Sequence, residues 1–351
     1  MNNPDNKSAL LIGEIGQNHN GSVDIAKLII DLAARPVRDE LFDLTLPGLD
    51  AVKLTKRDLT QELSEEQARR PYTGQNSFGK TYLEHREFLE LSNAEHFDVY
   101  QYAKSKGLIF VETLCAIGCL SMLELFSPDF LKVASRDLTN EPLLDALAAT
   151  KIPMIISTGM AGKEELNAAM EVITKHHDEV SILHCVSQYP TDPRNVNLRS
   201  MDYLRSNYPN HKIGYSDHTI GISAPVAAVA MGAEIIEKHI TLDRRMKGSD
   251  QAGSLGPDGV QRMVRDIRLT ELAIGTEEIF IAPGIEETRK KLERSIATRK
   301  ELKAGAVITE EDICLLSPGD GYKWSERDHV LGKKAKETLS EGVIIYPTSI
   351  E

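Results

Sequence analysis

The segment EIIEKHI, residues 234–240, is the last of eight short apolar runs that decide the fold of this 351-residue chain. All eight are rich in Ile, Val and Leu, and all are too short to form helices. Their continuous apolar character, without strict alternation, is typical of parallel strands that are covered on both faces. The other seven runs are LLIGEI (10–15), AVKL (51–54), LIFVET (108–113), FLKVAS (130–135), PMIIST (153–158), VSILHC (180–185) and KIGYS (212–216).

Amphipathic segments with helical spacing separate these runs. Examples are Asp24–Ala34, Lys163–His176 and Val260–Ile274. Eight strand–helix repeats predict an α/β fold, a (β/α)₈ TIM barrel over residues 1–280. An open doubly wound sheet is the structural alternative, but such sheets usually have fewer strands, and the early G-x-G-x-x-G motif of a dinucleotide site is missing.

Two insertions and a tail depart from the repeat. Residues 35–49 lengthen the connection to the second strand, and residues 58–92 form a long polar loop before a helical stretch. Long loops at the carboxyl end of barrel strands are often functional. A linker over 281–292 then leads to short strands and turns over 293–351, which predict a small, mainly-β domain.

Composition excludes several classes of protein. The chain has 41 Lys and Arg against 53 Asp and Glu, a formal net charge of -12, which disfavours binding to nucleic acid. No apolar run approaches the ~20 residues of a membrane span, and the N-terminus has no signal-peptide pattern. Four cysteines without a C-x-x-C motif predict reduced thiols and a cytoplasmic location.

Two histidines follow neighbouring strands of the predicted barrel. His218 comes directly after KIGYS-Asp217, and His239 shares a strand face with Glu237, because alternate strand residues point the same way. Two imidazoles with a carboxylate nearby can hold a divalent transition metal and leave positions open for water. The alternative, two hydrogen-bonded core histidines, has equal weight on this pattern alone.

A second set of polar residues gathers at the predicted strand ends. Lysine ammonium groups and serine hydroxyls that converge from several strands suit a phosphate or a carboxylate anion. Solvated residues on the barrel rim are the alternative. The set consists of Lys53, Lys132, Ser135, Ser157 and Ser216.

Several motifs together resemble one family. In order and spacing, the chain is similar to the sialic acid synthase (N-acetylneuraminate synthase) family, which includes spore-coat polysaccharide synthases. The tail over 293–351 resembles that family's antifreeze-like, or SAF, domain. The motifs are GEIGQNHNG (13–21), FLKVAS (130–135), HCVSQYP (184–190), GYSDHTIG (214–221) and EKHITLDRRMKGSDQAGSL (237–255).

The resemblance implies a reaction. Phosphoenolpyruvate would condense with N-acetylmannosamine, its 6-phosphate or a related hexosamine. The products would be a 2-keto-3-deoxy nonulosonic acid, for surface polysaccharide, and phosphate. It also implies a divalent cofactor, Mn²⁺ or else Mg²⁺ or Co²⁺. Two alternatives stay open: a phosphoenolpyruvate–sugar synthase of the 3-deoxy-octulosonate phosphate type, and a catalytically silent sugar-binding protein of coat assembly.

Matching positions carry the family's roles to this chain. The metal ligands would be His218 and His239. The proton-transfer residues would be Glu14 and Glu237, and the resemblance does not say which of the two is the base. The phosphoenolpyruvate set would be Lys53, Lys132, Ser135, Ser157, Ser187 and Ser216. The sugar set would be Asn76, Tyr189 and Asp250.

Three positions depart from the family pattern. Thr55 stands where many bacterial members have Gln, and Ser187 where an Asn often contacts phosphoenolpyruvate. In the tail, Ser317 stands where a bacterial Arg reaches the partner's site. The resemblance still implies a domain-swapped homodimer in which each tail covers the other subunit's active site.

Overall fold

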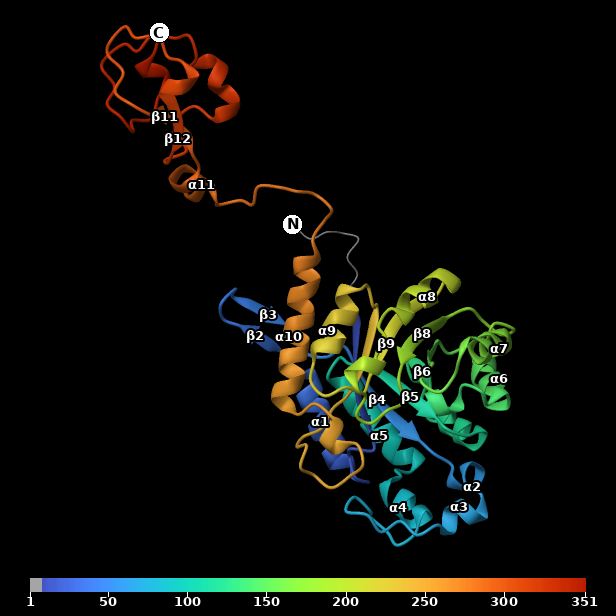
Figure 1. Cartoon of the computed structure of the whole chain (residues 1–351). Helices are drawn as coiled ribbons and strands as arrows, with labels where there is room; N and C mark the ends of the chain where they lie inside the picture. Colours follow the sequence, from blue (N-terminus) through green and yellow to red (C-terminus); the bar gives the residue numbers. More distant parts are fainter. Residues whose placement is uncertain (1–7) are drawn as a thin grey trace. The chain divides into compact units, whose positions relative to one another are not determined.

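The computed structural model describes residues 8–351, and it confirms the barrel prediction. Eight parallel strands close in the order β1-β10-β9-β8-β7-β6-β5-β4 (Figure 1). The eight apolar runs of the sequence supply all of them. Their bounds are β1 Leu10–Gly16, β4 Ala51–Lys56, β5 Ile109–Leu114, β6 Phe130–Val133, β7 Met154–Ser157, β8 Val180–Cys185, β9 Lys212–Asp217 and β10 Ile235–His239.

Helices cover the outside of this barrel, because each connection between parallel strands must return along the sheet. After β5 the connection is a 3₁₀ segment, Ile117–Glu124, instead of an α-helix. The α-helices of the barrel are α1 Val23–Ala34, α2 Leu59–Glu62, α3 Glu65–Arg69, α4 Tyr82–Leu89, α5 Asn93–Ser105, α6 Glu141–Ala149, α7 Lys163–Ile173, α8 Ser200–Asn207, α9 Ser223–Ala230 and α10 Pro257–Ile274.

The two insertions have structure of their own. The first holds a small antiparallel hairpin, β2 Val37–Asp39 and β3 Leu44–Leu46, which lies beside α10 (Figure 1). The second contains α2, α3 and α4. Thr81 and Glu84 form a capping box that begins α4, and this reciprocal pairing satisfies backbone N–H groups of the first turn.

The barrel interior is apolar at one end of the strands. Ile12, Ala51, Val111, Ile155, Leu183 and Ile235 form a buried cluster there. In most of these strands the residue two positions later is polar, and it points the same way because side chains alternate along a strand. The polar layer therefore lies at the carboxyl ends of the strands.

The chain divides after Gly275 into two compact units. The second contains α11 Glu286–Leu292 and an antiparallel pair, β11 Ser295–Thr298 and β12 Ile313–Leu316. Its own apolar core includes Ile296, Ile313 and Ile345. The predicted linker 281–292 therefore ends in a short helix.

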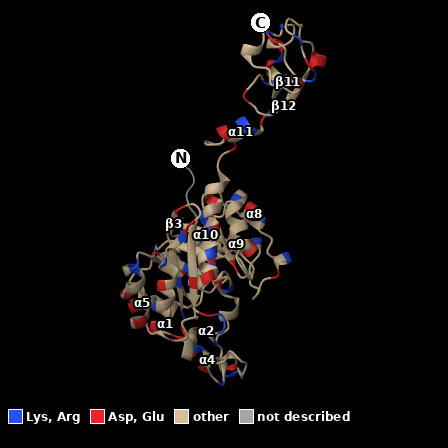
Figure 2. Ribbon diagram, turned by 90° about the vertical axis from the view of Figure 1, so that its left-hand side faces the viewer, with Lys and Arg blue, Asp and Glu red and all other residues tan. Residues whose placement is uncertain are grey.

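Figure 2 shows Lys and Arg interspersed with Asp and Glu along the helices that surround the barrel. Within residues 8–351, no helix is both long enough and apolar enough to cross a membrane.

Candidate active site

A cavity of about 190 Å³ opens at the carboxyl ends of the barrel strands. All the residues that the sequence singled out for the site line this cavity, with the exception of Asn76. They are Glu14, Lys53, Lys132, Ser135, Ser157, Ser187, Tyr189, Ser216, His218, Glu237, His239 and Asp250.

A lysine between two glutamates forms the centre of the cavity wall. Lys53 Nζ lies 2.6 Å from Glu14 Oε2 and 3.7 Å from Glu237 Oε2, and it donates to Thr113 Oγ1 at 3.3 Å. Ser216 Oγ donates to Glu237 Oε1 at 3.0 Å. All these side chains are buried, so each charge depends on its partners.

The two glutamates differ in their electrostatic surroundings. Burial raises the pKa of Glu14 to about 7, although the charge of Lys53 opposes this shift. Burial also disfavours ionised Glu237, but the positive charges of Lys132 and Lys53 outweigh it, so the pKa of Glu237 is lowered. Two carboxyl groups with separated pKa values can divide proton transfer and charge stabilisation between them.

Lys132 has no carboxylate partner within ion-pair distance among the described residues. Its ammonium donates to Ser157 Oγ at 2.7 Å and to the Val133 carbonyl at 2.9 Å, and burial lowers its pKa. A buried cation held by neutral groups is a ready partner for a substrate anion.

Gly159 approaches two serines of the cavity closely. Its N–H donates to Ser135 Oγ at 3.0 Å. A Cβ at this position would lie 2.5 Å from Ser187 Oγ and 2.8 Å from Ser135 Oγ, and both distances are shorter than real contacts allow. Two hydroxyls of the predicted phosphoenolpyruvate set, those of Ser135 and Ser187, therefore lie against a glycine backbone.

The two histidines lie together, with ring centroids 5.5 Å apart. Nδ1 of His218 is 3.0 Å from the Val186 carbonyl, and the Tyr189 ring lies over His218 at 4.0 Å, so this imidazole is oriented by its neighbours. Nδ1 of His239 is buried and has no hydrogen-bond partner among the described residues. Such an orphaned nitrogen fits a metal ligand better than a hydrogen-bonded core histidine.

The protein side chains supply only part of a coordination shell. Across residues 8–351, no three His, Cys, Asp or Glu side chains group closely enough to enclose a metal ion. Two imidazoles with room beside them fit an ion that keeps positions open for water or substrate.

Asn76 is the predicted site residue that the structure does not bring to the cavity. It is exposed, within the turn between Tyr72 and Lys80. The resemblance placed it by motif, and the packing of the turn points other residues of the insertion inward. Arg86 of α4 reaches the cavity instead.

Sequence reasoning gave no role to several further lining residues, among them Arg57, Arg86, Thr113 and Cys185. Thr113 and Cys185 were detectable, because each lies two residues after an apolar barrel residue on the same strand. Arg57 comes directly after β4, and Arg86 belongs to the insertion, so no strand period points either of them to the cavity.

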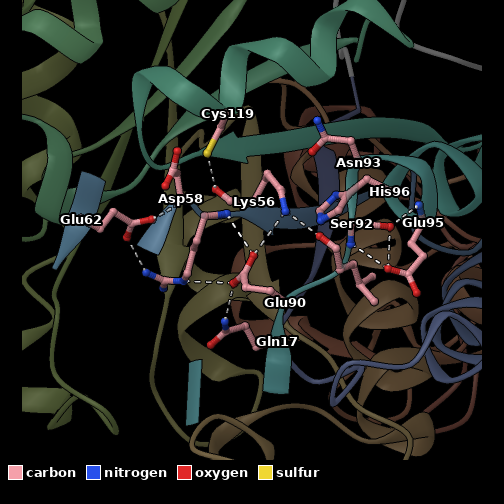
Figure 3. A network of polar contacts seen from close by, with 12 residues as sticks. Gln17, Lys56, Asp58, Glu62, Glu90, Ser92, Asn93, Glu95, His96 and Cys119 are labelled. Carbon is pink, nitrogen blue, oxygen red and sulfur yellow. Dashed lines mark hydrogen bonds and ion pairs between the residues drawn. The ribbon is translucent and has the colours of Figure 1, made fainter. Parts of the chain in front are cut away.

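A network of ion pairs lies beside the cavity (Figure 3). Glu90 is 3.8 Å from Lys56 Nζ and accepts the backbone N–H of Arg57, and Gln17 donates its amide to Glu90 at 3.3 Å. Glu62 accepts from Arg57 at 2.9 Å. This network joins β4, the insertion and the loop after β1.

Comparison with known proteins identifies the family. The NeuB family model matches residues 45–279, and the SAF domain model matches residues 293–351. The chain belongs to the NeuB family. It is a phosphoenolpyruvate-dependent, carbon–carbon bond-forming synthase of the sialic acid type with a C-terminal SAF domain, as the sequence motifs indicated.

Curated relatives match this NeuB-family chain along almost all of its length. It is 33% identical to N-acetylneuraminate-9-phosphate synthase of Mus musculus, over 97% of this chain and 92% of that protein. It is 34% identical to N,N'-diacetyllegionaminic acid synthase of Legionella pneumophila, over 98% and 95% respectively.

Solved structures agree with this membership. The N-acetylneuraminic acid synthetase of Leptospira borgpetersenii, solved with citrate, gives a TM-score of 0.66 at 30% identity, covering 81% of this chain and 90% of that chain. The spore coat polysaccharide protein SpsE of Bacillus subtilis gives 0.62 at 28% identity, covering 98% and 95%.

Proposed function

We propose that this protein condenses phosphoenolpyruvate with an N-acylated hexosamine, such as N-acetylmannosamine or its 6-phosphate. The products are a sialic-acid-like 2-keto-3-deoxy nonulosonic acid, destined for surface polysaccharide, and inorganic phosphate. The observation that carries the proposal is the convergence of two lysines, four serines, two glutamates and two histidines on one cavity. We expect the reaction to take place in the cytoplasm.

The residues of the cavity fit the reacting groups. Lys53 and Lys132 would balance the phosphate and carboxylate charges of phosphoenolpyruvate, with Ser135, Ser157, Ser187 and Ser216 donating hydrogen bonds. Carbon 3 of phosphoenolpyruvate attacks the open-chain aldehyde. Water then adds at carbon 2, and phosphate leaves from the tetrahedral intermediate. Glu14 or Glu237 would accept or deliver the protons.

His218 and His239 would hold a divalent ion, Mn²⁺ or else Mg²⁺ or Co²⁺. When bound, the ion would supply Lewis-acid polarisation of the aldehyde oxygen. Tyr189 and Asp250 line the same part of the cavity and would contact the hydroxyls of the sugar.

Release of phosphate from phosphoenolpyruvate tests this function. The assay uses a panel of hexosamines, their 6-phosphates and pentose phosphates, each with chelator and with Mn²⁺. We expect release with N-acylated hexosamines and Mn²⁺ only. Release with pentose phosphates alone would indicate an octulosonate-type synthase, and no release with any sugar would indicate a silent binding protein.

We also propose a domain-swapped homodimer. The segment before α11 exposes Ile279, Phe280 and Ile281, which a partner could cover. Within the C-terminal unit, Ser317 donates to the Leu292 carbonyl, and Lys323 is paired with Glu293. Arg327 is therefore more available than Lys323 for contact with a sugar. Solution scattering should give twice the 38.9 kDa chain mass. A monomer with full turnover would contradict the swap.

A further inference from the structure

The insertion that carries Arg86, residues 58–92, contains three helices and a buried aromatic stack. Its centre is His85, which is fully buried between the rings of Tyr72 and Phe78, at centroid distances of 4.5 and 5.9 Å. The backbone N–H of Phe78 donates to His85 Nδ1 at 3.2 Å, and an isolated bridge joins Pro71 to Thr81. The next residue, Arg86, therefore projects from a rigid support.

Arg86 lines the active-site cavity and has only neutral partners. Its Nε donates to the Tyr82 hydroxyl at 2.9 Å, and one terminal nitrogen donates to Gln17 Oε1. Gln17 is itself fixed, because its amide nitrogen donates to Glu90. Among the described residues, no carboxylate lies within ion-pair distance of Arg86.

The other two arginines of the cavity are neutralised. Glu62 Oε2 lies 2.9 Å from Arg57 and 2.8 Å from Arg136, and Asp137 lies 3.1 Å from Arg136. A carboxylate therefore already occupies the anion-binding side of both guanidinium groups. Of the three, Arg86 is the one whose positive charge is left for a ligand.

A second cation lies near this insertion. Lys247 Nζ stands 4.7 Å from the centroid of the Phe78 ring, and the described residues give it no ion pair. Burial, then the positive charge of Arg86, lowers the pKa of His85 to about 4, with Lys247 adding to the shift and Asp250 opposing it. Arg86 and Lys247 therefore both lie close enough to act on His85, with Asp250 opposing them.

We propose that Arg86 determines specificity for an acceptor sugar that carries a phosphate monoester, with Lys247 as an auxiliary cation. This inference rests on the proposed function and narrows its substrate to phosphorylated hexosamines. The proposed function already assigns Lys132, Ser135 and Ser157 to phosphoenolpyruvate, and of these Lys132 and Ser157 are buried. A planar guanidinium held by neutral groups suits two phosphate oxygens of a second, outer anion.

The test compares acceptors and variants of the full-length enzyme. Steady-state kinetics with N-acetylmannosamine and its 6-phosphate are measured for the native protein and for Arg86→Gln, Arg86→Lys, Arg136→Gln and Arg199→Gln. Arg199 is an exposed arginine outside this cavity, so its variant controls for loss of surface charge.

We expect the native enzyme to prefer the 6-phosphate. Arg86→Gln should lower kcat/KM for the 6-phosphate about 10- to 100-fold more than for the unphosphorylated sugar. Arg86→Lys should recover part of this difference, and Arg136→Gln should affect both acceptors in similar proportion. Equal losses for both acceptors in Arg86→Gln, a higher KM for phosphoenolpyruvate with either acceptor, or a native preference for the unphosphorylated sugar would overturn the proposal.

A binding measurement separates this proposal from the proposed function. Should the native enzyme release no phosphate with any acceptor, the function fails, and calorimetry still tests the site. N-acetylmannosamine 6-phosphate should then bind at least about tenfold more weakly to Arg86→Gln than to Arg199→Gln. Equal affinities would overturn the proposal.

Discussion

The two ends of the barrel interior are built from the same strands and differ in every chemical respect. At one end, Ile12, Ile155 and Ile235 are buried among apolar neighbours. Two residues further along the same strands, and on the same face, stand Glu14, Ser157 and Glu237. A step of about 6–7 Å along each strand therefore separates the stabilising core from the reactive layer.

This difference shows which layer of the barrel interior stabilises the fold and which layer lowers its stability. Burial of the apolar layer stabilises the barrel, whereas each buried charge of the upper layer must be matched by a partner or cost free energy. Glu14 and Lys53 match each other. Among the described residues, however, Lys132 has only neutral hydrogen-bond partners, and Nδ1 of His239 has none. The predictions below test this division, in order of decreasing effect.

The largest effect should follow removal of both histidines. In His218→Ala/His239→Ala, we expect turnover to fall at least about 1000-fold, because the polarising ion would lose its protein ligands, while the apolar layer keeps the fold intact. Bound metal, measured by mass spectrometry, should be lost together with turnover.

His176→Ala is the matched control, since His176 pairs with Asp145 at 2.8 Å in the helical layer. Chelator should abolish turnover of this variant, and Mn²⁺ should restore it. Full activity in a metal-free double histidine variant would show that His218 and His239 do not hold a metal ion that turnover requires.

The next effect concerns the apolar end. Ile155→Ala should lower the free energy of unfolding by about 2–5 kcal/mol, because it opens a cavity in a fully buried cluster. The kinetics of the remaining folded enzyme should change by less than about twofold. Denaturant unfolding and steady-state assays measure the two quantities. A tenfold rise in KM for phosphoenolpyruvate would show that the two layers are coupled.

The sequence predicted the barrel because each strand is a buried apolar run, and the physical signal is strong. It did not predict β2 and β3, because strands of three residues at a half-exposed edge carry no such run. The hairpin follows from packing against α10, a contact between residues far apart in the sequence.

The same reasoning explains which site residues could be found. The positions of Lys53, Lys132 and Ser157 can be predicted from the alternation of side chains along a strand. Each lies two residues after an apolar residue and therefore points to the same side of the sheet. Asn76 does not line the cavity in the structure, and its position depends on how a long insertion folds. Arg86 was missed for the same reason: its direction is fixed by the buried stack around His85, which no local pattern reveals.

A smaller effect should follow replacement of the unpaired buried lysine. Lys132→Met should lower kcat/KM for phosphoenolpyruvate. The loss of transition-state stabilisation should be about 1.5–3 kcal/mol, the value of a charge-assisted hydrogen bond. Its free energy of unfolding should change by less than about 1 kcal/mol, because the lost hydrogen bonds are offset by the relief of burying a charge. Kinetics with each substrate and denaturant unfolding test this. A loss of sugar affinity alone would contradict the assignment.

The smallest effect, and the finest test of the comparison, is Thr113→Val. Val111 belongs to the apolar layer, and Thr113 follows it on the same face of β5, so the substitution extends the apolar chemistry by one layer with little change of shape. Lys53 Nζ would lose one neutral acceptor at 3.3 Å, but would keep Glu14. We expect kcat/KM to fall roughly two- to twelvefold, which corresponds to a barrier higher by about 0.5–1.5 kcal/mol, with stability equal or slightly higher. Kinetics and thermal unfolding measure both. A variant that unfolds more readily while its turnover is unchanged would mean that Thr113 belongs to the stabilising layer, and the boundary between the two layers would then lie further along the strand.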